Sequence, residues 1–157
     1  IEAASFFLLA TSDEAGWPDC SWKGGAPGFV KLLDARTLAF PSYDGNGQYR
    51  SLGNLSVNPR AGLLFVDFAA PRRLRVNGRA EVTEDPALLS LWHGAEAAVR
   101  VEAVHVFPNC PRYVHGFEGG ALSPHVPEPG REPPTPEWKT RDAFNDALRE
   151  GDPAKRR

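Results

Sequence analysis

The segment that most favours ligand chemistry runs from Asp44 to Asn54 and reads DGNGQYRSLGN. Gly45 and Gly47 allow a backbone to approach a ligand closely, and the apolar spacing after them predicts a short helix. The unpaired N–H groups at the start of a helix favour an anion. Arg50 and Ser51 fall in that first turn, where a guanidinium and a hydroxyl can reach phosphate oxygens. The segment indicates an anion site, although a plain surface turn has the same composition.

Two further segments carry groups that could bind a ligand. Residues 20–28 read CSWKGGAPG, in which Trp22 and Lys23 could flank a planar ligand with a negative edge. Residues 71–75 read PRRLR and place three arginines on one predicted strand. Each segment also has a structural explanation: a glycine-rich hairpin end for the first, and an edge strand protected from aggregation by charge for the second.

The side chains that could act as nucleophiles or metal ligands form no known constellation. Cys110 and His115 lie in FPNCPRYVH at 107–115, but a Cys-His pair needs an orienting group and an oxyanion hole. The histidines form no H-x-x-x-H or H-E-x-x-H pattern. Cys20 and Cys110 match no zinc spacing and are interpreted as reduced thiols. The sequence therefore predicts no metal site and assigns no catalytic residue.

Composition limits the classes of partner. The chain has 157 residues, enough for one domain. Its formal net charge of −2 lacks the basic excess of a nucleic-acid-binding protein. No apolar run reaches the roughly 18 residues of a membrane span, and no signal peptide is visible. We expect a cytoplasmic protein that binds neither nucleic acid nor membrane.

The elements that would position these groups are mostly short strands. Apolar segments at regular intervals, separated by turn residues, predict an antiparallel meander or barrel and not a βαβ fold. The predicted strands cover residues 5–11, 17–22, 29–33, 37–40, 61–68, 74–82 and 98–107, with 61–68 central and a bulge or turn at 77–78. The predicted helices cover 49–57, 87–93 and 138–148. We expect a single domain with a β-rich part over 1–116 and a C-terminal arm over 117–157, which is extended in its Pro-rich part, 123–136.

Six segments in this order resemble the pyridoxamine 5′-phosphate oxidase-like family of FMN-binding split β-barrels, and most closely its branch without an assigned substrate. They are SWKGG at 21–25, GFVKLLDARTLAF at 28–40, DGNGQYRSLGN at 44–54, NPRAGLLFVDF at 58–68, LRVNGRAEV at 74–82 and FPNCPRY at 107–113. The resemblance implies a mainly β, antiparallel split barrel with short helices. It also implies a homodimer with two flavin mononucleotide (FMN) sites at the interface, each lined by both chains.

The resemblance also implies which residues contact FMN. Arg50 and Ser51 would hold the phosphate, and Trp22 and Lys23 would line the isoalloxazine ring. Lys23, or an arginine within 72–75, would stabilise the reduced flavin. The complete predicted cofactor set is Ser21, Trp22, Lys23, Gly24, Ser42, Tyr43, Arg50, Ser51, Asn54, Arg73 and Leu74.

One departure from the family bears on the substrate. The oxidase that acts on vitamin B6 carries a C-terminal Arg-x-His motif, and nothing after Trp138 reproduces it. We therefore expect a flavin-dependent oxidoreductase of unknown substrate that does not oxidise vitamin B6. The alternatives are a deazaflavin-dependent reductase, a non-enzymatic protein that binds or stores flavin or haem, and a structural dimer without a cofactor.

Overall fold

The computed structural model describes residues 1–43, 47–115, 134–148, 152 and 154–156. The chain divides into two compact units. The larger unit comprises residues 1–67 and 72–110, and the smaller unit comprises residues 68–71 and 111–157. In the part of the chain that the structure describes, no helix is long and apolar enough to cross a membrane.

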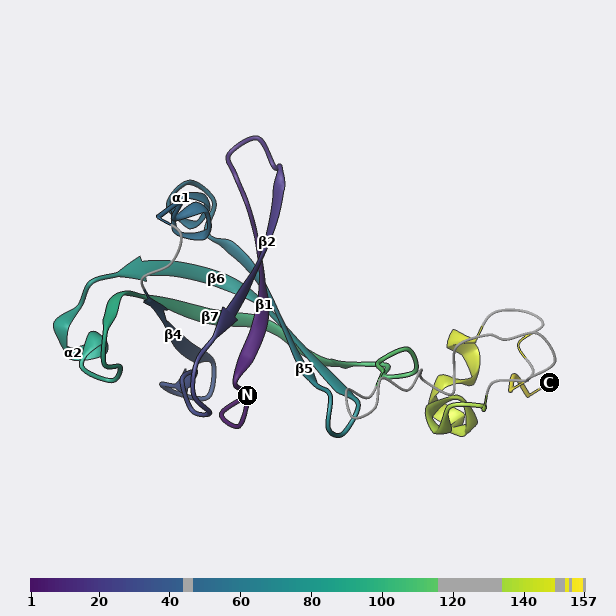
Figure 1. The fold of residues 1–157 in the computed structure, drawn as a ribbon. Coiled ribbons are helices and arrows are strands. Elements are labelled where there is room, and N and C mark those ends of the chain that lie inside the picture. The colour runs from purple at the N-terminus through teal and green to yellow at the C-terminus, as the bar shows by residue number, and fades with distance from the viewer. Residues whose placement is uncertain (44–46, 116–133, 149–151, 153, 157) are drawn as a thin grey trace. The chain divides into compact units, whose positions relative to one another are not determined.

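The larger unit is built on one seven-stranded sheet in which all neighbouring strands are antiparallel (Figure 1). The strand order is β2-β1-β5-β6-β7-β4-β3. The strands are β1 (Phe6–Ser12), β2 (Pro18–Gly24), β3 (Lys31–Leu32), β4 (Thr37–Tyr43), β5 (Arg60–Asp67), β6 (Arg72–Thr83) and β7 (Ala95–Asn109). The predicted antiparallel, mainly β class is confirmed. The described sheet is not closed into a barrel, because β2 and the two-residue β3 remain its edges.

Individual strands differ from their predicted extents. The strand expected at 29–33 is reduced to β3, because Phe29 and Val30 turn into the core instead of continuing the ladder. The strand expected to be central, 61–68, is the internal strand β5, whereas β6 occupies the middle of the sheet. The segment at 77–78 is a bulge, not a turn: Asn77 pairs with His105 but Gly78 pairs with Ala103, which leaves Val104 of β7 without a counterpart.

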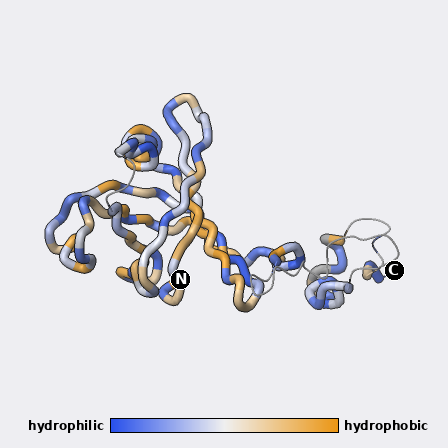
Figure 2. The backbone as a smooth tube through the Cα atoms, in the orientation of Figure 1, coloured by the Kyte–Doolittle hydropathy of each residue, from blue (hydrophilic) through white to orange (hydrophobic). Residues whose placement is uncertain are grey.

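The core forms on one face of this sheet through the alternation of side chains along each strand. Phe7 and Leu9 of β1 are fully buried. The Phe7 ring lies 4.8 Å from the ring of Phe40 and 5.1 Å from that of Phe65, measured between centroids. Figure 2 shows hydrophobic residues along β1 and β5, where this aromatic cluster joins neighbouring strands.

Two short helices accompany the sheet. Helix α1 (Arg50–Val57) has the predicted position, packs Leu55 into the core and ends at Asn58. Helix α2 (Pro86–Leu89) starts as predicted, with the Asp85 carboxylate accepting a hydrogen bond from the Ala87 N–H at 3.0 Å. It is shorter than the predicted 87–93, and the chain beyond it turns so that the Trp92 indole donates to the Phe29 carbonyl at 2.6 Å.

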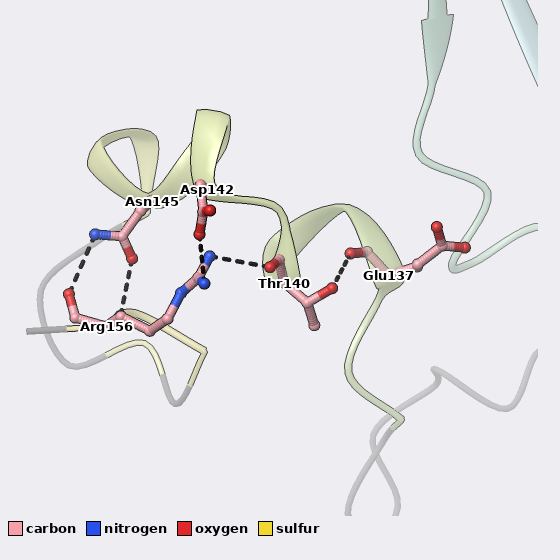
Figure 3. Close-up of polar contacts among 5 residues, drawn as sticks. All are labelled: Glu137, Thr140, Asp142, Asn145 and Arg156. Atoms are coloured by element: carbon pink, nitrogen blue, oxygen red, sulfur yellow. Dashed lines mark hydrogen bonds and ion pairs between the residues drawn. The ribbon is translucent and has the colours of Figure 1, made fainter.

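Where one terminal helix is predicted over 138–148, the described residues of the smaller unit form two 3₁₀ helices. They are η2 (Glu137–Thr140) and η3 (Asp142–Ala147), separated by Arg141 in an extended conformation. Figure 3 shows how Arg156 fastens them: its guanidinium pairs with Asp142 and donates to the Thr140 carbonyl, and its backbone pairs with the Asn145 amide. The predicted extended segment, 123–136, lies outside the described residues apart from its last three.

The aromatic cluster gives a test of the core. Replacing Phe7 by Ala is expected to lower the free energy of unfolding by about 3–5 kcal/mol, because it removes a buried ring and leaves a cavity. Urea unfolding followed by fluorescence measures the change. The control is Trp17→Ala, since the Trp17 side chain is 75% exposed and its loss is expected to cost less than about 0.5 kcal/mol. A similar loss in both variants would contradict the assignment of Phe7 to the centre of the core.

Candidate functional site

A hollow of about 460 Å³ lies between β2, the end of β4 and the start of α1. Strand β2 contributes Asp19, Ser21, Trp22 and Lys23, strand β4 contributes Ser42 and Tyr43, and the remaining wall is the chain over 47–52. The β2 residues precede Ser42 by at least 19 positions in the sequence, so only the fold brings β2 to β4 and α1. This is the place to which the sequence assigns an anion.

The strand β2 supplies polar groups to the hollow by simple alternation. Asp19, Ser21 and Lys23 stand opposite the buried Thr11, Leu9 and Phe7 of β1, so the three polar side chains share the face on which α1 packs. Trp22 belongs to the other face and stacks on Phe6, with ring centroids 4.1 Å apart and planes 3° from parallel. The hairpin therefore presents a polar row on one face and a stacked aromatic pair on the other.

The chain enters α1 through a strained turn. Gly47 and Tyr49 have φ values of 73° and 48°, in the left-handed region that a tyrosine rarely adopts. The Tyr49 hydroxyl donates to Glu96 Oε2 at 3.0 Å, which ties this turn to the start of β7. No side chain caps the N-terminus of α1, and its first turn contains no acidic residue. The helix start is therefore suited to an anion supplied from outside the helix.

Hydroxyls and cations converge on this helix start. The Ser51 Oγ lies 3.2 Å from the Ser21 Oγ, and Ser51 is buried. The Arg50 Nε lies 3.4 Å from Asp19 Oδ1. Burial lowers the pKa of the Lys23 ammonium, and the Asp19 carboxylate opposes this shift by favouring the charged form. A guanidinium, an ammonium and two hydroxyls beside an uncapped helix form a donor set suited to a phosphate group.

Most of the predicted cofactor residues line this hollow, namely Ser21, Trp22, Lys23, Ser42, Tyr43, Arg50 and Ser51. Gly24 lies at the end of β2 beyond it, so close to Trp22 that an added Cβ would lie 2.9 Å from the indole nitrogen. Asn54, in the second half of α1, is not among the residues that line the hollow, and its side-chain amide donates to Thr11 Oγ1 of β1 at 3.0 Å.

Arg73 and Leu74 also lie outside the hollow. Both belong to β6, and the Arg73 guanidinium donates to the carbonyl oxygen of Cys110 just beyond β7. Strands β1 and β5 separate β6 from β2 in the sheet. Within one chain, the structure therefore does not bring these two predicted residues to the other members of the set.

Sequence reasoning did not select Asp19 or Tyr49, which also line the hollow. A signal for Asp19 was present, because it precedes Ser21 and Lys23 at the two-residue spacing that places all three on one face of a strand. Nothing in the sequence marks Tyr49 as left-handed. Among the described residues, no group of three or more His, Cys, Asp or Glu side chains could hold a metal ion.

Comparison with known proteins identifies the class to which this fold and hollow belong. A family model described as pyridoxamine 5′-phosphate oxidase matches residues 1–113. The chain therefore belongs to the pyridoxamine 5′-phosphate oxidase family, as the resemblance implies. No curated protein sequence matches the chain.

Three solved structures illustrate the fold. A candidate pyridoxamine 5′-phosphate oxidase from Lactobacillus delbrueckii is 25% identical, with a TM-score of 0.52 over 66% of this chain and 84% of that chain. HupZ from Group A Streptococcus is 21% identical, with a TM-score of 0.53 over 75% and 89% of the two chains. An FMN-binding protein from Syntrophomonas wolfei is 10% identical, with a TM-score of 0.51 over 69% and 79%. At their identities, the last two show a shared fold alone.

The lowered pKa of Lys23 predicts a pH dependence of stability. Between that lowered pKa and the ordinary value of 10.5, the unfolded chain binds the proton more tightly than the folded chain. The free energy of unfolding is therefore expected to rise with pH in this window. Urea unfolding at pH values up to 10.5 should show a smaller rise in Lys23→Gln than in the unaltered protein. An identical rise in both proteins would show that Lys23 is not desolvated.

Proposed function

We propose that this protein is an FMN-binding split β-barrel that acts as a flavin-dependent oxidoreductase. The observation that carries the proposal is the convergence of Lys23, Arg50, Ser51 and Ser21 on the uncapped start of α1. Trp22 and Tyr43 are among the residues that line the same hollow. A phosphate group and a flat ring system are the two chemical parts of FMN, so the residues present fit this cofactor.

The roles of these residues follow from their chemistry. Arg50, Ser51 and the first N–H groups of α1 would bind the phosphate. Lys23 would favour negative charge on the ring, and Trp22 would limit the position of the ring through its own stacking on Phe6. When bound, the flavin supplies hydride transfer, and the protein contributes binding, orientation and tuning of the ring. No protein nucleophile is needed for this chemistry.

The substrate is proposed to differ from vitamin B6. The C-terminal residues read KTRDAFNDALREGDPAKRR after Trp138 and lack the Arg-x-His motif that grips the substrate in the family oxidase. Two arginines of the smaller unit are already paired with carboxylates: Arg141 pairs with Glu137 at 2.9 Å, and Arg156 pairs with Asp142. The proposed cofactor is therefore that of the family, whereas the proposed substrate is a molecule other than vitamin B6.

We further propose that two copies of the chain form a homodimer with FMN at the interface. Arg73 and Leu74 lie outside the hollow of their own chain, so they would reach the cofactor from a second copy. The distal half of β7 also exposes apolar side chains: Val104 is 54% exposed, Val106 57% and Phe107 38%. Several exposed apolar side chains gathered in one segment are typical of an interface.

The first test is the absorbance spectrum of the purified protein, repeated on the supernatant after heat denaturation. Released FMN, identified by mass, would support the proposal. A released deazaflavin would instead indicate the deazaflavin-dependent reductase, and bound haem would indicate a storage protein. A colourless protein that takes up no added FMN would contradict the cofactor assignment. Bound flavin without turnover of any nicotinamide donor would contradict the oxidoreductase assignment alone.

The phosphate contact gives a sharper test. Arg50→Ala is expected to weaken FMN binding by about 1.5–3 kcal/mol, or about 10- to 150-fold in Kd, because it removes a charge-assisted hydrogen bond. Quenching of flavin fluorescence on titration measures the change. Arg36→Ala is the matched control, since Arg36 is an exposed arginine in the β3–β4 turn. Equal affinities in Arg50→Ala and Arg36→Ala would exclude Arg50 from the phosphate site.

The dimer has its own test. Val106→Glu is expected to convert the dimer to a monomer and to reduce FMN uptake, because it places a charge in an apolar interface. Sedimentation velocity gives the oligomeric state, and absorbance gives the flavin content. The control is Leu91→Glu, because Leu91 is a 46% exposed apolar residue after α2. A monomeric unaltered protein, or a dimer that survives Val106→Glu, would contradict the proposed interface.

A further inference from the structure

We propose that Asp19 sets the affinity of the hollow for phosphate by competing with the ligand for Arg50. The inference rests on the function proposed for this hollow and adds a residue whose effect on binding is unfavourable. An acidic side chain in a phosphate site repels its ligand, so its presence there needs an explanation. The explanation lies in the two cations that Asp19 faces.

The first cation is Arg50, whose Nε lies 3.4 Å from Asp19 Oδ1. The two side chains differ in freedom: that of Asp19 is 21% exposed and that of Arg50 is 67% exposed. Asp19 is also held within the β1–β2 ladder, opposite Thr11. The carboxylate is therefore the fixed member of the pair and the guanidinium is the member that can turn. A guanidinium binds carboxylate and phosphate oxygens with the same donors, so the two anions compete for it.

The second cation is Lys23, which lies four residues after Asp19 on the same face of β2. The Asp19 carboxylate favours the charged form of this partly buried ammonium and opposes the effect of burial. One carboxylate thus serves as counter-ion to both cations of the hollow. A phosphate dianion balances two cations, but it leaves an excess negative charge when Asp19 is also ionised. Asp19 therefore lowers the affinity for phosphate while it relieves the repulsion between Lys23 and Arg50.

This arrangement predicts effects of opposite sign when the charge is removed. Asp19→Asn is expected to bind FMN about tenfold more tightly, because the phosphate no longer competes with a carboxylate. The same variant is expected to have a lower melting temperature without FMN, because two cations then share the hollow without a counter-ion. Riboflavin, which has the ring but no phosphate, should bind Asp19→Asn and the unaltered protein equally. A residue that merely positioned Arg50 would lower both stability and affinity.

The experiment is a fluorescence titration of apoprotein with FMN and with riboflavin, combined with thermal melts. Asp19→Ser provides a second neutral variant in case Asp19→Asn does not fold, and Asp19→Glu, which restores the charge, should return the FMN affinity toward that of the unaltered protein. Asp34→Asn is the matched control, because Asp34 is an aspartate outside the hollow whose pKa is lowered chiefly by the hydrogen bond that the Arg36 N–H donates to it. Its FMN affinity should remain unchanged.

The possible results separate this inference from the proposed function. FMN affinity that is unchanged or weaker in the neutral variants, in a protein that does bind FMN, would overturn the role of Asp19 alone. A protein that binds no FMN would overturn the proposed cofactor, and inorganic phosphate then becomes the probe. A larger rise in melting temperature with phosphate in Asp19→Asn than in the unaltered protein would still support competition at Arg50. An equal or smaller rise would overturn it.

Discussion

The hollow depends on how α1 is held against the β1–β2 hairpin. The Asn54 amide donates to Thr11 Oγ1 at 3.0 Å and the Asn58 amide donates to Ser12 Oγ at 2.8 Å, while Leu55 enters the core between them. A helix of eight residues is not stable alone in water, so these contacts fix its position. They also fix the direction of its first turn, where Arg50 and Ser51 lie. Asn54, which is predicted as a ligand contact, lies in this interface and positions the residues one turn earlier.

Local patterns in the sequence predict the parts of the fold that local forces determine. The apolar strand and turn at 5–16 predict β1, and the apolar spacing after the glycine loop predicts α1. The terminal segment also has helical spacing, yet it forms two short 3₁₀ helices separated by Arg141. These helices are held by Arg156, which donates a hydrogen bond to the Thr140 carbonyl 16 residues earlier in the chain. The pairing of Asp19 with Arg50 is likewise tertiary. Composition shows both charges, but only the packing of α1 on β2 makes them neighbours.

The end of the family match lies close to the boundary between the two compact units. The family model ends at residue 113, close to the end of the larger unit at Cys110. The sheet and the proposed cofactor hollow thus lie within the part of the chain that the family model matches, and most of the smaller unit lies beyond it. Its ion pairs, including Lys139 with Asp152, hold it together internally. One fold can host different functions, because function depends on the residues of the site and not on the fold alone.

The single unmatched residue in β7 lies where the strand passes from buried to exposed. Up to Ala103, alternate residues of β7 such as Val99 and Val101 are buried in the core, whereas Val104 at the bulge and Val106 beyond it are exposed. Residues that pair across two strands share a face of the sheet, so the bulge absorbs Val104 and keeps Val106 on the face of its partner Val76. Loss of Val104 would therefore leave the pairing of the distal half of β7 in place. In evolutionary terms, a one-codon insertion or deletion at this position is a way for such a chain to change one exposed side chain without altering its core.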